Sequence, residues 1–559
     1  MSKGLKNVFI AILVVFMSLS LFAGCGSDDQ TGTDTGDSEQ PVPTEQSDES
    51  AQPSEADDDN ASFHSEQPLK FSLLYSSNPD YPYKEDWLLW KAIKDKTNVS
   101  FDVTVVPMSD YAQKRSLLIS TGDAPYIIPK TYHPDEVQFI PSGAILPVSD
   151  YVDKMPNFSR QVKEWGLEDE INTYKQRDGK YYLLPGLHEI LTPDYGIAMR
   201  TDILEKNNIP LPNTWDEMYE ALKKLKQLYP DTYPLSDRYQ AKSLLNIAAP
   251  TFGKAAAGWG AGDGVYYDRD NDKFIFYPTT DDYKNFLAYF NKLIKEGLMD
   301  PESFTQNDDQ AIQKFVTGKS FAISANSQHL TGLRKTMDET VGKGAYEVKK
   351  LIPPAGPAGP VITGSRLENG IMISSKAKDD PNFEQLLKFI DWLWYSDEGQ
   401  ILCKWGVEGT TYKRTADGKF ELMPDITFQW MNPSGTKDLR KDFGFGNGVF
   451  ILMYGGPKYL AESYMSPEDL EFVSEVNSKR ELLPSAPPIL YDEGEREQAN
   501  MLSTPLMDYV ESMTLKFILG DASLESDWDK YVQDCRQKGS DRLVELANKV
   551  YQNTKDVLK

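Results

Sequence analysis

The sequence is poor in the residues that build disulfides and transition-metal sites. It has three cysteines and four histidines among 559 residues. Cys25, Cys403 and Cys535 are too few for a disulfide framework, and the histidines are too widely spaced for a His-rich zinc site. No apolar run after Phe22 is long enough to span a bilayer. The formal net charge is −26, and such an acidic chain is not expected to bind nucleic acid.

The sequence also lacks complete catalytic and metal-binding motifs. A stretch that ends like a phosphate-binding loop has Gln313 where the first glycine must stand. A stretch that begins like a zinc-protease helix has Thr192 in place of the second histidine, and an EF-hand-like stretch has Lys273 and Thr279 where glycine and glutamate are needed. We therefore expect no enzyme and no metal site. A catalytic carboxylate pair could still be hidden among 85 acidic residues, so a surface-anchored polysaccharide hydrolase or lyase stays an alternative.

The N-terminus has the pattern of a secretory signal with a lipid-attachment cysteine. Two lysines precede a mostly apolar run from Val8 to Phe22, which is too short for a comfortable membrane span. The run closes with FAGC at 22–25, which resembles a bacterial lipobox whose cysteine receives diacylglycerol. We expect residues 1–24 to be a lipoprotein signal peptide and Cys25 to anchor the protein at the extracellular face of the bacterial cell membrane. The alternative is an ordinary secretory signal cut near Ala23.

The segment that follows the cysteine has the composition of a disordered tether. Residues 26–67 contain 13 Asp and Glu and no Lys or Arg. Because apolar residues are scarce, this segment cannot bury enough surface to offset its ordering entropy. We therefore interpret residues 25–67 as a lipidated cysteine and an acidic tether that hold a folded body away from the membrane.

The folded body begins with alternating strand and helix patterns. Residues 70–75 and 101–106 read as strands, and residues 84–97 and 109–120 read as helices with apolar positions at helical spacing. This alternation predicts a parallel α/β sheet. Farther along, Thr214 and Glu217 have the spacing of a capping box at the start of another helix.

Several stretches of the body together resemble one known family. The resemblance rests on their order and spacing: STGDAPYII at 120–128, DGKYYLLPG at 178–186, MRTDILEKNNIPLPNTWDEM at 199–218, KEGLMDPESF at 295–304 and FIDWLWYSDEGQILCKWGVEGTTY at 389–412. They resemble the extracellular solute-binding lipoproteins of bacterial ABC importers, in the large oligosaccharide-binding subgroup of family 1. The resemblance implies a two-lobed periplasmic-binding-protein-like α/β fold with multiple crossovers between the lobes and a ligand cleft.

The resemblance also implies how the chain is divided and how it works. Lobe one is expected at 68–198 plus 368–412, and lobe two at 199–367 plus 413–559. The lobes would close by a hinge motion around an oligosaccharide and present it to the permease subunits of an importer. We expect a monomer without cofactors. A sensor lipoprotein that presents its ligand to a membrane kinase is a further alternative.

One departure from the family concerns calcium. Larger relatives carry an oxygen-rich calcium loop just after the capped helix, whereas this chain has YPDTYPLS at 229–236. The oxygen ligands are missing from this segment, so we predict no structural calcium there.

The candidate ligand-binding residues are aromatic and polar side chains in predicted loops and strand ends. Aromatic rings can cover the apolar face of a sugar, and polar groups can pair with its hydroxyls. The candidates are Tyr75, Ser76, Asp123, Tyr126, Asp194, Tyr195, Trp259, Gln328, Arg366, Tyr412 and Trp430. The sequence does not name the sugar. The acidic body disfavours a polyuronate, although a local basic cleft could be lined by Arg115, Arg200, Arg238 or Arg366.

Overall fold

The computed structural model describes residues 62–448, 450 and 455–558. Cys25 and the predicted signal peptide lie outside these residues. Within the described part of the chain, no helix is long and apolar enough to cross a membrane.

The first of two main sheets has five strands in the order β2-β1-β3-β11-β4. β1 pairs in parallel with β2 and β3, and β11 runs antiparallel to β3 and β4. The strands are β1 (Leu69–Ser77), β2 (Val99–Pro107), β3 (Ile127–Thr131), β4 (Leu184–Leu187) and β11 (Leu367–Ile373). The predicted alternation of strands and helices at the start of the body is confirmed. The parallel sheet that it implied is joined by one antiparallel strand from far along the sequence.

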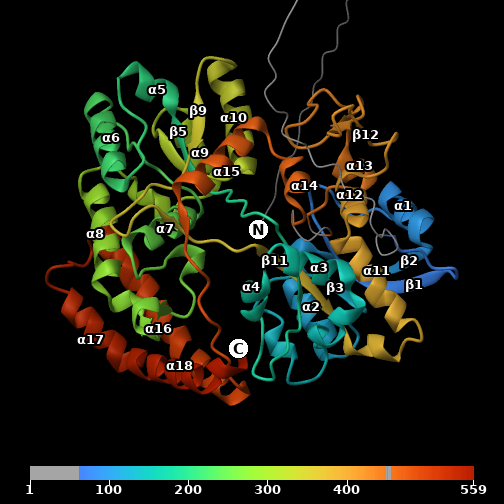
Figure 1. Cartoon of the computed structure of the whole chain (residues 1–559). Coiled ribbons are helices and arrows are strands. Elements are labelled where there is room, and N and C mark those ends of the chain that lie inside the picture. Colours follow the sequence, from blue (N-terminus) through green and yellow to red (C-terminus); the bar gives the residue numbers. More distant parts are fainter. Residues whose placement is uncertain (1–61, 449, 451–454, 559) are drawn as a thin grey trace, which may run out of the picture. The chain divides into compact units, whose positions relative to one another are not determined.

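The helices of this first lobe share one hydrophobic core with the five-stranded sheet, and Figure 1 shows them grouped around its strands. Asp391 of α11 shows how they are joined, because its buried carboxylate accepts hydrogen bonds from the backbone N–H groups of Asn157 (3.0 Å) and Phe158 (2.8 Å) at the start of α3. The helices are α1 (Leu88–Thr97), α2 (Tyr111–Ser120), α3 (Pro156–Glu164), α4 (Glu168–Asn172), α11 (Phe383–Tyr395), α12 (Asp397–Trp405), α13 (Leu439–Phe443) and α14 (Lys458–Glu462).

The second main sheet has three antiparallel strands in the order β8-β5-β9. They are β5 (Gly196–Arg200), β8 (Ala322–Ala325) and β9 (Val348–Leu351). The expected capping box is present at α6: Thr214 Oγ1 accepts from the Glu217 N–H, and the Glu217 carboxylate accepts from the Thr214 N–H. The helices before α11 in this lobe are α5 (Thr201–Lys206), α6 (Trp215–Leu228), α7 (Lys242–Ala248), α8 (Asp281–Lys295), α9 (Asp308–Val316) and α10 (Ser327–Met337).

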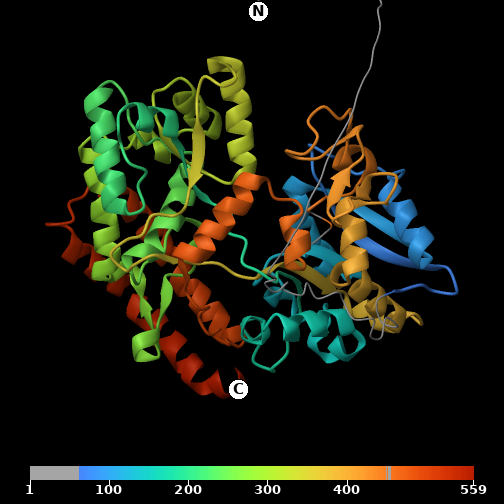
Figure 2. The same ribbon diagram turned by 45° about the horizontal axis from the view of Figure 1, so that its top comes forward.

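The C-terminal part of the chain completes the second lobe. The long helix α16 packs against α8, α17 and α18 (Figures 1 and 2). α16 ends at Leu519 because Gly520 adopts a left-handed conformation there. The helices are α15 (Pro467–Lys479), α16 (Glu493–Leu519), α17 (Trp528–Lys538) and α18 (Ser540–Thr554).

Eight short strands of the described residues form four two-stranded sheets outside the main sheets. β6 (Val265–Asp268) and β7 (Lys273–Phe276) make an antiparallel hairpin in the second lobe. The others pair as β10 with β16, β12 with β13 and β14 with β15. Their bounds are β10 (Val361–Ile362), β12 (Tyr412–Arg414), β13 (Phe420–Leu422), β14 (Ile426–Thr427), β15 (Lys437–Asp438) and β16 (Glu481–Leu482).

The two largest hydrophobic clusters of the described residues lie in different lobes. One core takes buried residues from 69–187 and 367–464, and the other takes them from 197–322 and 499–550. The chain crosses between the lobes at 188–195, at 352–366 and after Tyr464. The expected start of lobe two at residue 413 differs from this arrangement. The Trp405 ring stacks on Phe420 and on Tyr464, with ring centroids 5.0 Å apart in both pairs, so this part of the chain belongs to the first core.

Candidate functional site

One edge of the second sheet gathers several of the candidate residues. β5 and β8 are antiparallel, with Gly196 opposite Ala325. The start of β5 therefore lies beside the end of β8. Asp194 and Tyr195 directly precede β5, and Gln328 lies in the first turn of α10, just after β8. This edge is also where the first crossing segment enters the second lobe.

Asp194 is fixed at this edge by hydrogen bonds and an ion pair. Its Oδ1 atom accepts from the backbone N–H (2.9 Å) and the hydroxyl (2.6 Å) of Ser327, and it lies 3.1 Å from the Lys350 ammonium. Lys350 also donates to the Ser327 hydroxyl at 2.7 Å. Asp194 thus joins the start of β5 to the start of α10, which is a positioning role whatever else its second oxygen contacts.

Tyr195 and Trp259 form an aromatic pair beside this edge. Their ring centroids lie 5.0 Å apart with the planes inclined by 56°. Trp259 is 48% exposed, although large aromatic rings are normally covered. The backbone next to Trp259 requires glycine, because Gly258 has a φ of 62° and a Cβ there would lie 2.1 Å from the Lys242 carbonyl oxygen. The fold therefore holds an indole ring open to solvent.

A strained loop lies between the aromatic pair and α10. Tyr239, Gln240 and Ala241 all have left-handed φ values, at 51°, 54° and 57°. Three consecutive non-glycine residues in this region are costly, at about 1–3 kcal/mol each, and such strain gathers at binding and active sites. Tyr239 is 52% exposed. Sequence reasoning missed Tyr239, since no local pattern signals this conformation.

Arg238 directly precedes this loop, and its side chain ties the start of the loop to neighbouring elements. Its guanidinium donates to the Ser324 carbonyl (3.2 Å) at the end of β8, contacts Asp308 (3.3 Å) and lies 2.9 Å from His329 Nδ1. Burial and, secondly, the positive charge of Arg238 lower the pKa of His329. The same His329 Nδ1 atom also lies 2.5 Å from Asn326 Oδ1. Arg238 is therefore committed to protein groups rather than to a ligand.

Four other candidates serve packing in this structure. Tyr75 is 1% exposed, and its hydroxyl accepts a hydrogen bond from the Asn447 amide; burial raises its pKa. Ser76 and Tyr412 are also buried in the first lobe, and Tyr412 packs against the Trp405 ring. Arg366 is bound to the Glu170 carboxylate and to two backbone carbonyls. The structure does not bring these four side chains to an open surface.

The three remaining candidates lie in other parts of the first lobe. Asp123 is exposed, and Tyr126 is partly buried near Asp380. Trp430 is exposed over part of its ring and donates its Nε1–H to the Tyr464 carbonyl at 2.8 Å. Within the described residues, no hydrogen bond or ring contact joins any of these three to the edge of the second sheet. Their assignment as ligand contacts stays a prediction.

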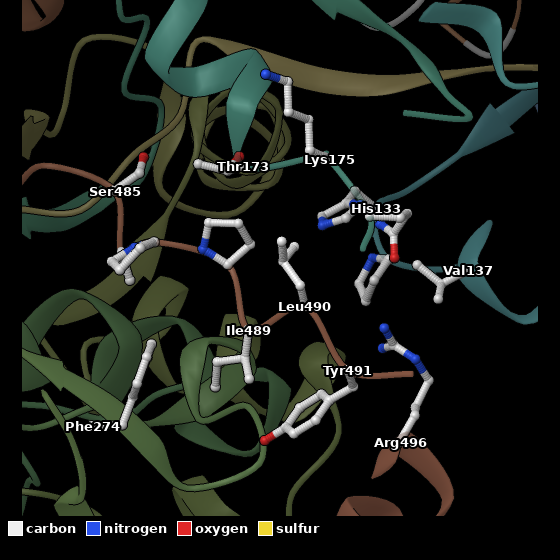
Figure 3. Close-up of a pocket in the computed structure, with 15 residues that line it drawn as sticks. His133, Val137, Thr173, Lys175, Phe274, Ser485, Ile489, Leu490, Tyr491 and Arg496 are labelled. Atoms are coloured by element: carbon white, nitrogen blue, oxygen red, sulfur yellow. The ribbon is translucent and has the colours of Figure 1, made fainter. Parts of the chain in front are cut away.

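A cavity of about 360 Å³ lies between segments of the two lobes (Figure 3). His133 contributes from the first lobe; its ring stacks on Tyr174 at 4.2 Å and its Nδ1 lies 2.6 Å from the Glu136 carboxylate. Phe274 of β7 and Arg496 of α16 contribute from the second lobe. The β6–β7 hairpin follows directly on the loop that carries Trp259. The segment that carries Trp259 and the hairpin that contributes Phe274 to the cavity are thus adjacent in the sequence.

The four arginines that could have made a basic cleft are all neutralised by carboxylates. Each forms an ion pair with one acidic side chain, at distances of 2.6–3.3 Å. The pairs are Arg115 with Asp135, Arg200 with Asp202, Arg238 with Asp308 and Arg366 with Glu170. A positively charged ligand site must therefore come from other residues.

A lysine occupies the carboxylate cluster that contacts Ser236, the last residue of the segment in which we predict no calcium. The Lys314 ammonium lies 2.7 Å from Asp300 Oδ2 and 2.5 Å from Glu302 Oε2. Asp300 is buried and also accepts from the Ser236 hydroxyl at 2.8 Å. In the part of the chain that the structure describes, no group of three or more His, Cys, Asp and Glu side chains could hold a metal ion.

Residues 89–411 match the family described as bacterial extracellular solute-binding protein. The chain belongs to this family. It is 23% identical over 494 residues to lipoprotein LipO of Bacillus subtilis (strain 168), covering 83% of this chain and 89% of that protein. It is 24% identical over 477 residues to the polygalacturonan/rhamnogalacturonan-binding protein YtcQ of the same organism, covering 83% and 88%. It is 23% identical over 518 residues to the fructooligosaccharide ABC transporter substrate-binding protein FusA of Streptococcus pneumoniae serotype 4, covering 86% and 90%.

Solved structures have the same fold. An extracellular solute-binding protein from Bifidobacterium longum subsp. infantis superposes with a TM-score of 0.66 at 18% identity, over 89% of this chain and 100% of that one. The alginate-binding protein AlgQ2, in a form without calcium ion, superposes with a TM-score of 0.64 at 18% identity, over 88% and 100%. The two-lobed α/β fold expected from the sequence is confirmed.

Proposed function

We propose that this solute-binding protein captures an oligosaccharide and delivers it to an ABC importer. The observation that carries the proposal is the Tyr195–Trp259 pair, held open beside the edge where the chain crosses between the lobes. Two relatives that match over more than four-fifths of this chain, YtcQ and FusA, are named for binding saccharides.

The chemistry of this edge suits a sugar chain. A sugar ring has an apolar C–H face, which an exposed indole and phenol can cover, and a rim of hydroxyls that needs hydrogen-bonding partners. Gln328 at the start of α10 is exposed, and so is Tyr239 in the loop that Arg238 contacts. A polar group that loses its partner costs about 1–3 kcal/mol, which is the basis for discrimination between sugars.

The mechanism we propose is hinge closure. A ligand that contacts both lobes stabilises the arrangement in which they close on it, by as much as its affinity differs between the open and closed states. The importer would recognise the closed form. Binding needs no covalent step, so we propose that the chain is a binding protein and not an enzyme.

We also propose that the protein acts at the outer face of the bacterial cell membrane, held there by lipid on Cys25. The support is the lipobox-like sequence FAGC at 22–25 and the match to a lipoprotein, LipO. Replacement of Cys25 by Ser should abolish metabolic labelling with a fatty acid and release the protein into the medium. Unchanged labelling would rule out this anchor.

The binding proposal is tested with the purified full chain and a panel of neutral and acidic oligosaccharides. At about 100-fold its dissociation constant, a ligand should stabilise the protein by about 2.7 kcal/mol. Trp259→Ala should remove this shift, whereas Tyr233→Ala, which removes an exposed ring elsewhere in the second lobe, should keep it. Absence of any shift across the panel would contradict the proposal, and shortened sugars after incubation would favour a hydrolase or lyase.

A further inference from the structure

The cavity between the lobes differs in charge from the rest of the chain. The protein carries 85 acidic residues against 59 basic ones. None of the fifteen described residues that line the cavity is acidic, and two of them, Lys175 and Arg496, are cations. In a chain with this composition, a cavity wall that carries only positive formal charge requires an explanation.

The two cations are also unpaired. Among the residues that the structure describes, neither Lys175 nor Arg496 forms a side-chain hydrogen bond or an ion pair. The Arg496 guanidinium is partly buried and lies 5.9 Å from the centre of the Tyr491 ring. Burial lowers its pKa, against the opposing effects of Tyr491 and Glu136. Desolvating a guanidinium without an anionic partner is unfavourable, so the site gains stability when an anion joins it.

The Glu136 carboxylate, whose charge acts on Arg496, is engaged through one of its two oxygens. Glu136 is buried, and its Oε1 atom lies 2.6 Å from His133 Nδ1. It therefore offsets part of the positive charge near Arg496 without forming an ion pair with it. Farther along the same segment, Arg177 binds Asp492 and Glu495, so those two carboxylates are also compensated.

The positions of the two cations differ. Figure 3 shows the Arg496 side chain directed toward Val137 and His133, whereas Lys175 begins near Thr173 and its ammonium points away from Arg496 and Leu490. Ile489 and Leu490 project from a proline-containing segment on the same wall. The wall thus offers one inward-directed cation beside polar and apolar surface, as a carboxylated sugar ring would need.

We propose that this cavity binds a carboxylate group of an acidic oligosaccharide, with Arg496 as the residue that selects uronate rings over neutral ones. This inference rests on the proposed function and names its substrate class. Arg496 can receive a carboxylate through two parallel N–H···O bonds. Thr173 and Gln176 on the same wall donate to the Glu170 and Tyr174 carbonyls, and their oxygen atoms can still accept from ring hydroxyls.

The test compares charged sugars with uncharged copies of themselves. Linear trisaccharides of galacturonate, glucuronate and mannuronate are titrated into the full chain by calorimetry, each beside its methyl ester, which keeps the ring and the linkage but removes the charge. At least one acid should bind about 10- to 100-fold more tightly than its ester, and its affinity should fall as salt is raised.

A variant of Arg496 locates the effect. Arg496→Gln should weaken binding of the acid by about tenfold and leave binding of the ester unchanged. Arg160→Gln, which removes an exposed cation of the first lobe that is paired with Glu164, should change neither. Thermal midpoints check that each variant is folded, and Arg496→Lys, which keeps the charge, should retain part of the affinity.

The outcomes separate the inference from the proposed function. If neutral oligosaccharides bind and the acids bind no more tightly than their esters, the protein is an oligosaccharide carrier and this inference is wrong. If an acid binds tightly but Arg496→Gln behaves like Arg160→Gln, the carboxylates are held elsewhere and the inference is again wrong. If no oligosaccharide binds at all, the proposed function itself fails.

Discussion

The ammonium group of Lys404 donates a hydrogen bond to the carbonyl oxygen of Gly455 inside the first lobe. Lys404 is 1% exposed, and burial lowers its pKa to about 7. Gly456, the next residue, pairs with His188 on the segment that leaves for the second lobe. Burial and the nearby Lys404 lower the pKa of His188 to about 4. A titratable lysine therefore lies next to the start of the crossing at 188–195.

Lys404 should make stability rise with pH between about 7 and 10.5. The pKa of this lysine in the folded protein is about 7, against an ordinary value of 10.5. Between these values the unfolded chain binds a proton that the folded chain does not, so the free energy of unfolding rises with pH, by up to about 1.4 kcal/mol per pH unit. The effect is absent below pH 7, where both states are protonated. Lys404→Met should lack this contribution, so its stability relative to wild type should be highest near pH 7.

Urea denaturation at pH 7, 8 and 9 measures the difference. The control is Lys388→Met, which removes an exposed lysine of α11 that is paired with Glu384. Its difference from wild type should stay constant with pH. A constant difference for Lys404→Met as well would show that Lys404 is not held in the uncharged form.

The capping box at α6 should contribute measurably to stability. Thr214→Ala removes the hydroxyl that accepts from the Glu217 N–H at 3.1 Å and leaves that donor without its partner. The loss should be about 0.5–2 kcal/mol in the free energy of unfolding. Thr214→Ser keeps the acceptor oxygen and should restore most of the stability. Equal destabilisation by Ala and Ser would indicate that the threonine methyl, and not the cap, matters.

Chelation of divalent ions should not destabilise the protein. The Lys314 ammonium already binds Asp300 and Glu302, so these carboxylates have a cationic partner without calcium. We expect the thermal midpoint to be the same with excess EDTA and with excess calcium. A drop with EDTA that calcium reverses would contradict this expectation.

The same ion pair predicts the effect of removing the lysine. Lys314→Met leaves the buried Asp300 carboxylate with only the Ser236 hydroxyl and the Glu302 N–H as partners. The free energy of unfolding should fall by about 1–3 kcal/mol. Lys319→Met, which removes a neighbouring lysine with no ion pair among the described residues, is the matched control and should have little effect. Equal losses in both variants would count against the role of the ion pair.

The local elements could be predicted from the sequence because their signals are local. The capping box at Thr214 and the stop at Gly520 each depend on residues within one turn. The burial of Tyr75 could not be predicted in this way, since its hydroxyl meets Asn447, 372 positions away in the chain. A residue at a strand end reads as exposed until the segment that covers it is known.

At the candidate site, too, only residues with a local signal in the sequence could be predicted. Trp259 could be named a candidate because it stands between two glycines, and its ring is exposed where Gly258 turns the chain. The left-handed Tyr239 was missed, since its conformation is maintained by Arg238 and by a backbone hydrogen bond to Asp308 from a distant helix. Arg496 was missed as well. Arg496 differs from the other arginines discussed because its guanidinium has no ion-pair partner among the described residues. Ion-pair partners are set by tertiary contacts, which the sequence does not show.

Removal of Arg238 should raise the pKa of His329. The guanidinium lies 2.9 Å from His329 Nδ1, and its positive charge adds to burial in lowering the pKa of that imidazole, against Asp308 and Asp194. In Arg238→Gln the two carboxylates are no longer opposed, so protonation becomes easier.

A chain with four histidines gives few imidazole signals in an NMR titration, so His329 can be assigned with one His329→Gln variant. Its pKa should move upward in Arg238→Gln and stay unchanged in Arg160→Gln, which alters a distant ion pair. The same guanidinium also donates to the Ser324 carbonyl of β8 and so fixes the strained Tyr239 loop to that strand. Arg238→Gln should therefore weaken binding of every sugar, charged or not. An unchanged or lower pKa of His329 would show that Arg238 does not control this imidazole.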